Sequence, residues 1–99
     1  MPTHVHIPQA SLAAFCQRHH IRRLALFGSV LRDDFRPDSD VDVLVEFEAG
    51  HVPGFEFAGM EMELTALIGR KVDLRTPGDF SAKSREQIAA TSVVQYAAE

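Results

Sequence analysis

Short apolar runs alternate along this chain with longer segments of helical periodicity, and this alternation limits the folds that the chain can adopt. The apolar runs at residues 24–27 and 43–45 are too short for helices, and Gly28 stops the first, as is typical of strands buried in a sheet. Apolar side chains repeat at helical spacing over residues 8–20 and 57–68, and Gly69 can cap the second of these helices. The predicted elements are helices at 8–20, 29–32, 57–68 and 81–96 and strands at 24–27, 40–47 and 71–76. We therefore predict an α/β (α+β) fold, with helices packed on a small mixed sheet of three or four strands.

Length and composition narrow the class of protein. The 99 residues contain no repeat or linker-like run, which predicts one domain spanning residues 1–99. The single Cys16 excludes an internal disulfide and a cysteine-rich zinc site. No segment reaches the roughly 18 apolar residues of a membrane span, and no cationic stretch leads into an apolar run at the start. We expect a soluble, unexported, cytoplasmic protein with no membrane partner.

Acidic residues are concentrated in the middle of the chain. Residues 40–69 contain seven Asp or Glu and no Lys or Arg, whereas both ends are close to neutral. A segment of this charge repels a nucleic-acid backbone and suits metal cations or a basic protein surface. A solvated helix face and one acidic strand end are the simpler explanation for most of the glutamates. We therefore expect no direct contact with nucleic acid.

The strand that ends at Gly28 leads into a turn with the features of a phosphate site. Gly28 lets the backbone approach a ligand closely, and Ser29 offers a hydroxyl group and free backbone N–H groups where a short helix begins. Taken alone, a Gly-Ser pair is better explained as an ordinary strand-to-helix turn whose serine caps the helix.

Three aspartates are candidates for metal binding. Asp40 and Asp42 lie two residues apart on a predicted strand, so both carboxylates should share one face. Oxygen ligands of this kind favour Mg²⁺, which usually arrives with substrate phosphates. If the strand containing Asp73 lies beside that of Asp42, three carboxylates converge and could hold two Mg²⁺ ions for attack on the α-phosphorus of a nucleoside triphosphate. Asp73 could then accept the proton of the attacking hydroxyl, although alone it resembles an acid at a strand edge.

These elements occur together and in a fixed order, which points to a known family. Gly28-Ser29 is followed by Arg32, then by Ser39-Asp40-Val41-Asp42, and later by Val72-Asp73-Leu74. This combination closely resembles the minimal nucleotidyltransferases of the DNA polymerase beta-like superfamily. More narrowly, it resembles the MNT-domain antitoxins that are paired with HEPN ribonuclease toxins, and the resemblance extends from the first helix to the last. It implies a nucleotidyltransferase-like fold.

The resemblance also implies an activity and a set of site residues. It assigns nucleotide binding to Gly28, Ser29, Arg32 and Ser39, and catalysis with metal binding to Asp40, Asp42 and Asp73. ATP is implied as the donor, Mg²⁺ as the cofactor, and a tyrosine of a HEPN-type toxin as the acceptor of AMP. The protein would then be an antitoxin that silences its toxin by adenylylation. Many relatives have glycine after the motif arginine, where this chain has Asp33.

A second hypothesis is an antitoxin that only binds its partner and masks it without catalysis. The helix that contains Glu56, Glu61 and Glu63 could meet a basic ribonuclease surface. Masking would survive the loss of Asp40 and Asp42, whereas enzymatic silencing would not.

The histidines and the single tyrosine stay outside these predictions. Zinc-binding spacing is absent from the five histidines, which are His4, His6, His19, His20 and His51, so we interpret them as surface or helix-end residues. Tyr96 is placed on the predicted last helix, where a tyrosine usually packs against the fold.

Overall fold

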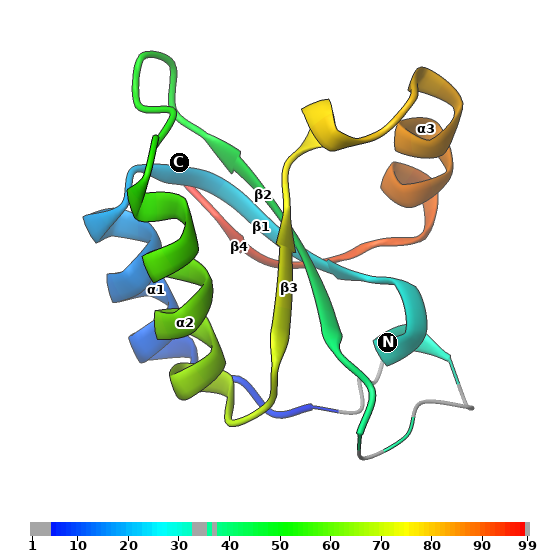
Figure 1. Ribbon diagram of the computed structural model, residues 1–99, viewed down its shortest axis with the longest axis horizontal. Coiled ribbons are helices and arrows are strands. Elements are labelled where there is room, and N and C mark those ends of the chain that lie inside the picture. The colour runs from blue at the N-terminus through cyan, green and yellow to red at the C-terminus, as the bar shows by residue number, and fades with distance from the viewer. Residues whose placement is uncertain (1–4, 33–35, 37, 99) are drawn as a thin grey trace.

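A four-stranded mixed sheet forms the centre of the computed structural model, which describes residues 5–32, 36 and 38–98 (Figure 1). The strand order is β3-β2-β1-β4. Strand β1 (Ile21–Phe27) pairs antiparallel with β2 (Val41–Phe47) and with β4 (Val93–Ala97), and β2 pairs parallel with β3 (Val72–Arg75). The predicted mixed sheet is confirmed, with four strands.

Two helices cover one face of this sheet. Helices α1 (Gln9–Arg18) and α2 (Glu56–Ile68) lie side by side on that face, and α3 (Ala82–Thr91) lies on the other side (Figure 1). The buried core lies between the sheet and the first two helices, and its larger members are Leu12, Phe15, Ile21, Leu24, Leu26, Val30, Val41, Val43, Val45, Met60, Leu64 and Val72. Helix α3 has no buried residue. The sheet therefore has one face committed to the core and one that is much more open.

The alternation along β2 explains the difference between the two faces. Val41, Val43 and Val45 are fully buried against the helices, whereas Asp42 and Leu44 between them are only half-buried. Successive side chains of a strand point to opposite faces, so β2 supplies the core on one side and acidic and aliphatic groups on the other. The predicted apolar run at 43–45 thus includes one residue, Leu44, that faces away from the core.

The helix predicted at residues 81–96 is wrong at residues 92–96. Helix α3 ends at Thr91, and β4 follows after Ser92. Val93 and Val94 pair with β1, and Tyr96 stands opposite Leu24 and packs against the core from a strand, not from a helix. β-branched residues fit a pleated strand better than a helix, and the free edge of β1 supplies the partner.

Two shorter helices complete the fold. The predicted short helix at 29–32 is the 3₁₀-helix η1 (Gly28–Leu31), and a second 3₁₀-helix, η2 (Pro77–Asp79), follows β3. Gly69 caps α2 as predicted, with a φ of +81° and its N–H donating to the carbonyl of Thr65 at 2.8 Å. No helix among the described residues is both long and apolar enough to cross a membrane.

Candidate active site

The turn from β1 into η1 brings the backbone of Gly28 against the side chain of Asp42. Gly28 has a φ of +75°, and a Cβ atom at this position would lie 2.3 Å from Asp42 Oδ2 and 3.2 Å from Asp42 Cγ. Phe27 stands directly opposite Asp42 in the antiparallel ladder, which fixes this approach. The next residue, Ser29, donates its backbone N–H to the Asp42 carboxylate. Glycine is therefore required here for both its backbone conformation and its lack of a side chain.

Asp42 and Asp73 lie side by side on neighbouring strands. They are register partners in the parallel pairing of β2 with β3, which places both on the open face of the sheet. Burial raises the pKa of Asp42, and the negative charges of Asp73 and Asp40 raise it further, while the Ser29 N–H opposes the shift. The expected adjacency of the two strands is thus present, and the carboxylates on them repel each other.

Asp40 is placed differently from the expectation. The strand begins at Val41, whose N–H donates to the Lys71 carbonyl at 2.8 Å, so Asp40 stands one residue ahead of β2 and is exposed. Among the described residues, the three aspartates do not form a group whose ligand atoms all lie within 4.8 Å of one another. Asp42 and Asp73 are the pair that the sheet holds together.

Two residues that the sequence analysis did not assign to the site contact this pair or its strand. The Arg75 guanidinium donates to both carboxylate oxygens of Asp73, with Nε to Oδ1 at 3.1 Å and Nη2 to Oδ2 at 3.3 Å. Glu61 of α2 accepts the backbone N–H of Leu74 at 2.8 Å and so holds β3 beside its helix. The i, i+2 spacing from Asp73 to Arg75 on a strand is the one local signal that could have found the first of these contacts.

The segment before β2 is held by a second arginine. The Arg70 guanidinium donates to the carbonyls of Arg36 at 2.7 Å and Ser39 at 3.2 Å. The Ser39 hydroxyl accepts the Arg36 N–H at 3.1 Å, so in this structure the hydroxyl closes its own turn. Asp33, the residue after the motif arginine, lies outside the described residues.

Arg32 lies at the far end of η1, at the mouth of a cavity. Its backbone N–H donates to the Ser29 carbonyl at 3.0 Å, and its side chain is exposed. Together with Gly28, Leu31 and Thr91 it lines a hollow of about 360 Å³ beside the turn. A guanidinium in this position is suitable for contact with phosphate oxygens.

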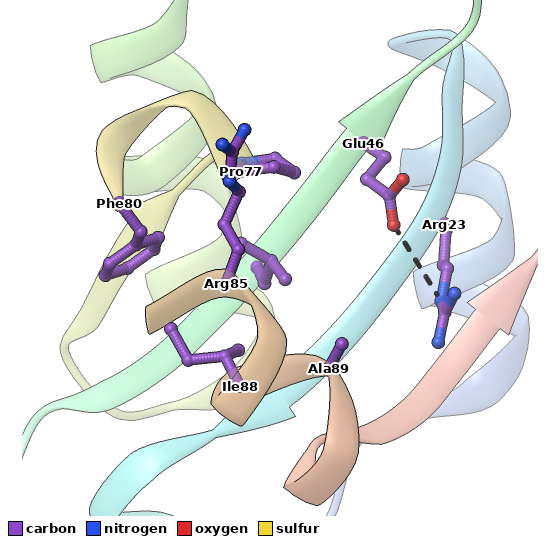
Figure 2. Close-up of a pocket in the computed structure, with 8 residues that line it drawn as sticks. Arg23, Glu46, Pro77, Phe80, Arg85, Ile88 and Ala89 are labelled. Atoms are coloured by element: carbon purple, nitrogen blue, oxygen red, sulfur yellow. Dashed lines mark ion pairs between the residues drawn. The ribbon is translucent and has the colours of Figure 1, made fainter. Parts of the chain in front are cut away.

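A second hollow opens on the same face, between the sheet and α3. It has a volume of about 240 Å³, and its lining residues are Arg23, Leu44, Glu46, Pro77, Phe80, Arg85, Ile88 and Ala89. Figure 2 shows Arg85, Ile88 and Ala89 extending from α3 over β2, with the Arg23 to Glu46 ion pair on the opposite wall. Leu44 follows Asp42 on the same face of β2. The ring of Phe80 packs edge to face against the ring of Phe27, with the two ring centroids 5.8 Å apart. The hollow therefore opens on the same face of the sheet as the aspartate pair.

The carboxylate oxygens of Asp42 and Asp73 are suitable ligands for a hard cation. The Asp42 carboxylate is half-buried, repelled by Asp73, and accepts a hydrogen bond from the Ser29 backbone N–H. A divalent cation bound by carboxylate oxygens would relieve that repulsion, and such oxygens are the usual ligands of Mg²⁺. The residues present thus fit Mg²⁺ bound together with a phosphate ligand at the Gly28 turn.

Comparison with known proteins identifies relatives of this chain. A protein adenylyltransferase, MntA of Thermococcus cleftensis, is 42% identical over 59 residues, which are 59% of this chain and 58% of that protein. The matched segment is thus less than two thirds of that relative. A solved structure described as a minimal nucleotidyltransferase is 33% identical, has a TM-score of 0.72, and is matched over 86% of each chain.

Two solved toxin–antitoxin complexes share the fold at lower identity. One, solved with AMP-PNP, is 16% identical with a TM-score of 0.73 over 94% of this chain and 76% of that one. The other holds a tri-AMPylated HEPN toxin of Shewanella oneidensis with an MNT antitoxin. It is 15% identical, with a TM-score of 0.65, over 91% of this chain and 70% of that one. The nucleotidyltransferase domain family matches residues 10–94. The chain therefore belongs to the nucleotidyltransferase domain family and is related to the MntA protein adenylyltransferases.

Proposed function

We propose that this protein is a Mg²⁺-dependent adenylyltransferase that transfers AMP from ATP to a tyrosine hydroxyl of a HEPN-type toxin, for which it is the antitoxin. The observation that carries the proposal is the register pairing of Asp42 with Asp73 beside the Gly28 turn. The related MntA is a protein adenylyltransferase, and a HEPN toxin bound to an MNT antitoxin of the same fold is AMPylated.

Each residue around the pair has a role in this proposal. The Gly28 and Ser29 backbone and the Arg32 guanidinium bind the nucleotide phosphates, and Ser39 shapes the loop that carries Asp40. Asp40, Asp42 and Asp73 would hold Mg²⁺, with two ions expected. When bound, Mg²⁺ neutralises charge on the phosphates and favours in-line displacement.

The reaction exchanges one phosphorus–oxygen bond for another. The acceptor hydroxyl oxygen bonds to the α-phosphorus of ATP, the bond from that phosphorus to the β-phosphate oxygen breaks, and pyrophosphate leaves. Asp73 accepts the hydroxyl proton, for which it must exchange its contact with Arg75 for one with the acceptor. Because Asp73 lies on β3, the acceptor approaches from the β3 edge while the phosphates lie at the β1 end.

The hollow beneath α3 is the place that we propose for the adenine ring. Its walls combine aliphatic side chains with Phe80 and the Arg85 guanidinium, and such walls suit a flat heteroaromatic ring. Replacing Ile88 by Trp would fill the hollow, so we expect the KM for ATP to rise at least tenfold. An unchanged KM for ATP, measured by pyrophosphate release, would place the base elsewhere. Glu86→Trp, on an exposed position of the same helix, is the control.

The test of the activity itself is transfer of label from α-³²P-ATP, with Mg²⁺, into a co-purified partner protein. A labelled band with the wild type, and none with the Asp40→Ala, Asp42→Ala double variant, is the expected result. The Asp38→Ala variant removes an exposed acid of the same loop and should label normally. Label from γ-³²P-ATP should remain out of the protein, because the γ-phosphate departs in pyrophosphate. Label from the γ-position would indicate phosphate transfer and overturn the proposal.

The binding-only antitoxin remains the alternative, and the structure changes how it should be tested. Glu63 bonds to Arg18 and His19 of the α1 end, and Glu61 accepts from Leu74. Charge reversal at these two positions would therefore damage the fold as well as any docking surface. Glu56, which is exposed in the first turn of α2, is the better position for charge reversal. Neutralisation that survives loss of Asp40 and Asp42 but fails with Glu56→Lys would favour masking.

A further inference from the structure

The structure brings together two histidines and a glutamate that lie far apart in the sequence. His20 occupies the turn between α1 and β1, and Glu48 and His51 follow β2. One ligand atom from each of the three lies within 4.8 Å of the others. Helical spacing could not have revealed this group, because 31 positions separate the two histidines and a strand pairing joins them.

Backbone hydrogen bonds fix the three residues relative to one another. The Glu48 N–H donates to the His20 carbonyl at 2.9 Å, and the His51 N–H donates to the Glu48 carbonyl at 3.0 Å. Gly50, with a φ of +81°, permits the tight turn from Glu48 to His51. His20 itself has a φ of 57°, in the left-handed region that a non-glycine residue rarely adopts. The backbone is thus set before any ligand arrives.

We propose that His20, Glu48 and His51 form a second metal site, for Zn²⁺ or a chemically similar transition-metal ion. Two imidazoles and one carboxylate are a ligand set that zinc accepts, with further positions left for water. Mg²⁺ prefers oxygen ligands alone, so the chemistry of this group differs from that of the aspartates. The site also lies at the opposite end of β1 and β2 from Asp42, about 20 Å away by the rise of a seven-residue strand.

The two histidine rings would have to turn before both could bind one ion. The His20 and His51 rings are stacked, with centroids 3.9 Å apart and planes 18° from parallel. Nitrogen lone pairs lie in the ring planes, so stacked rings direct them side by side instead of at a common point. Both histidines are exposed, which leaves room for the rings to turn toward one ion. Glu56, which favours a cation, and Arg18, whose guanidinium is bound to Glu63, line the same hollow as the two histidines.

A bound ion would link the α1–β1 turn to the β2–α2 loop. It would therefore stabilise the folded protein, since the unfolded chain does not hold the three ligands together. The measurement is calorimetric titration of the full chain with ZnCl₂ at pH 7.5 in the absence of nucleotide, together with thermal unfolding with and without Zn²⁺. We expect one ion per chain, a rise in Tm, and shifts of the His20 and His51 ring signals in NMR spectra.

Matched variants separate this site from others. His20→Asn keeps a residue that tolerates positive φ and removes the imidazole, and His51→Gln removes the second ring. Each should weaken Zn²⁺ binding at least tenfold, whereas His6→Gln and the Asp40→Ala, Asp42→Ala double variant should bind as the wild type does. Zn²⁺ affinity that is unchanged in His20→Asn and His51→Gln, or lost in the aspartate double variant, would overturn the proposal. So would the absence of stoichiometric binding to the wild type.

Discussion

Replacement of Gly28 by alanine tests the proposed site at its most crowded point. The new Cβ would lie 2.3 Å from Asp42 Oδ2, whereas ordinary van der Waals contact begins at about 3.4 Å. The carboxylate must therefore move by about 1 Å, and its hydrogen bond from the Ser29 N–H is disturbed. A misplacement of about 1 Å in a catalytic constellation can reduce the rate about 100-fold. We expect a loss of that size in adenylyl transfer by the Gly28→Ala variant.

The stability cost of the same substitution comes mainly from the backbone. An alanine at a φ of +75° costs roughly 1 to 2 kcal/mol. For a domain of this size that cost lowers Tm by roughly 5 to 15 °C. Gly50 has a φ of +81° and no atom within 4 Å of its Cβ position, so Gly50→Ala carries the same backbone cost without the collision. The two variants should lose similar stability and differ in activity.

The assay is initial-rate transfer of label from α-³²P-ATP at a temperature well below both melting points. Circular dichroism confirms that both variants are folded under those conditions. If Gly28→Ala transfers label as fast as the wild type, the packing of the turn against Asp42 has no catalytic importance. If Gly50→Ala is equally slow, the loss reflects stability, and the reasoning from the collision fails.

Three further predictions follow from the packing. Burial and the acidic neighbours raise the pKa of Asp42 above its ordinary value of 3.8. Asp42 therefore makes the protein less stable as pH rises through the interval between its unfolded and its folded pKa. The Asp42→Asn variant should have a higher Tm than the wild type at pH 7 and nearly the same Tm below pH 3.8. Glu61→Ala leaves the Leu74 N–H without its acceptor and should lower the free energy of unfolding in urea by about 1 to 3 kcal/mol. Met62, whose side chain is 73% exposed, is the control, and Met62→Ala should change the free energy of unfolding by less than about 0.5 kcal/mol. Burial raises the pKa of the Cys16 thiol to about 12, so a thiol reagent should label it only as the chain unfolds; rapid labelling of the native protein would contradict the packing of α1.

Local signals predicted the first two thirds of the fold well. Gly28 ends β1 and Gly69 ends α2 because both positions require positive φ, a requirement that a sequence displays directly. The alternation of acids and valines in β2 likewise depends only on the period of a strand. The residues of the candidate site could be proposed because the family pattern fixes their order along the chain.

Non-local pairing accounts for what the sequence did not predict. The boundary between α3 and β4 has no Gly or Pro, and the chain becomes a strand there because β1 offers an unpaired edge. The contact of Glu61 with Leu74 depends on how α2 crosses back over the sheet, which no local pattern encodes. The meeting of His20 with His51 has the same cause, since the pairing of β1 with β2 brings their flanking turns together.

The carboxylate of Asp42 destabilises the folded protein, as its raised pKa indicates, and the proposed function needs the same carboxylate to bind a cation. The strand period that buries Val41 and Val43 requires Asp42 to face the open side, and parallel pairing then sets it beside Asp73. The Ser29 N–H donates to Asp42, while Arg75 is engaged by Asp73, and the pKa of Asp42 still stays raised, so the repulsion is only partly offset. A cation that binds both carboxylates would offset the remainder. Mg²⁺ should therefore raise the Tm of the wild type and not that of Asp42→Asn, and equal stabilisation of both proteins would show that the aspartate pair is not where the ion binds.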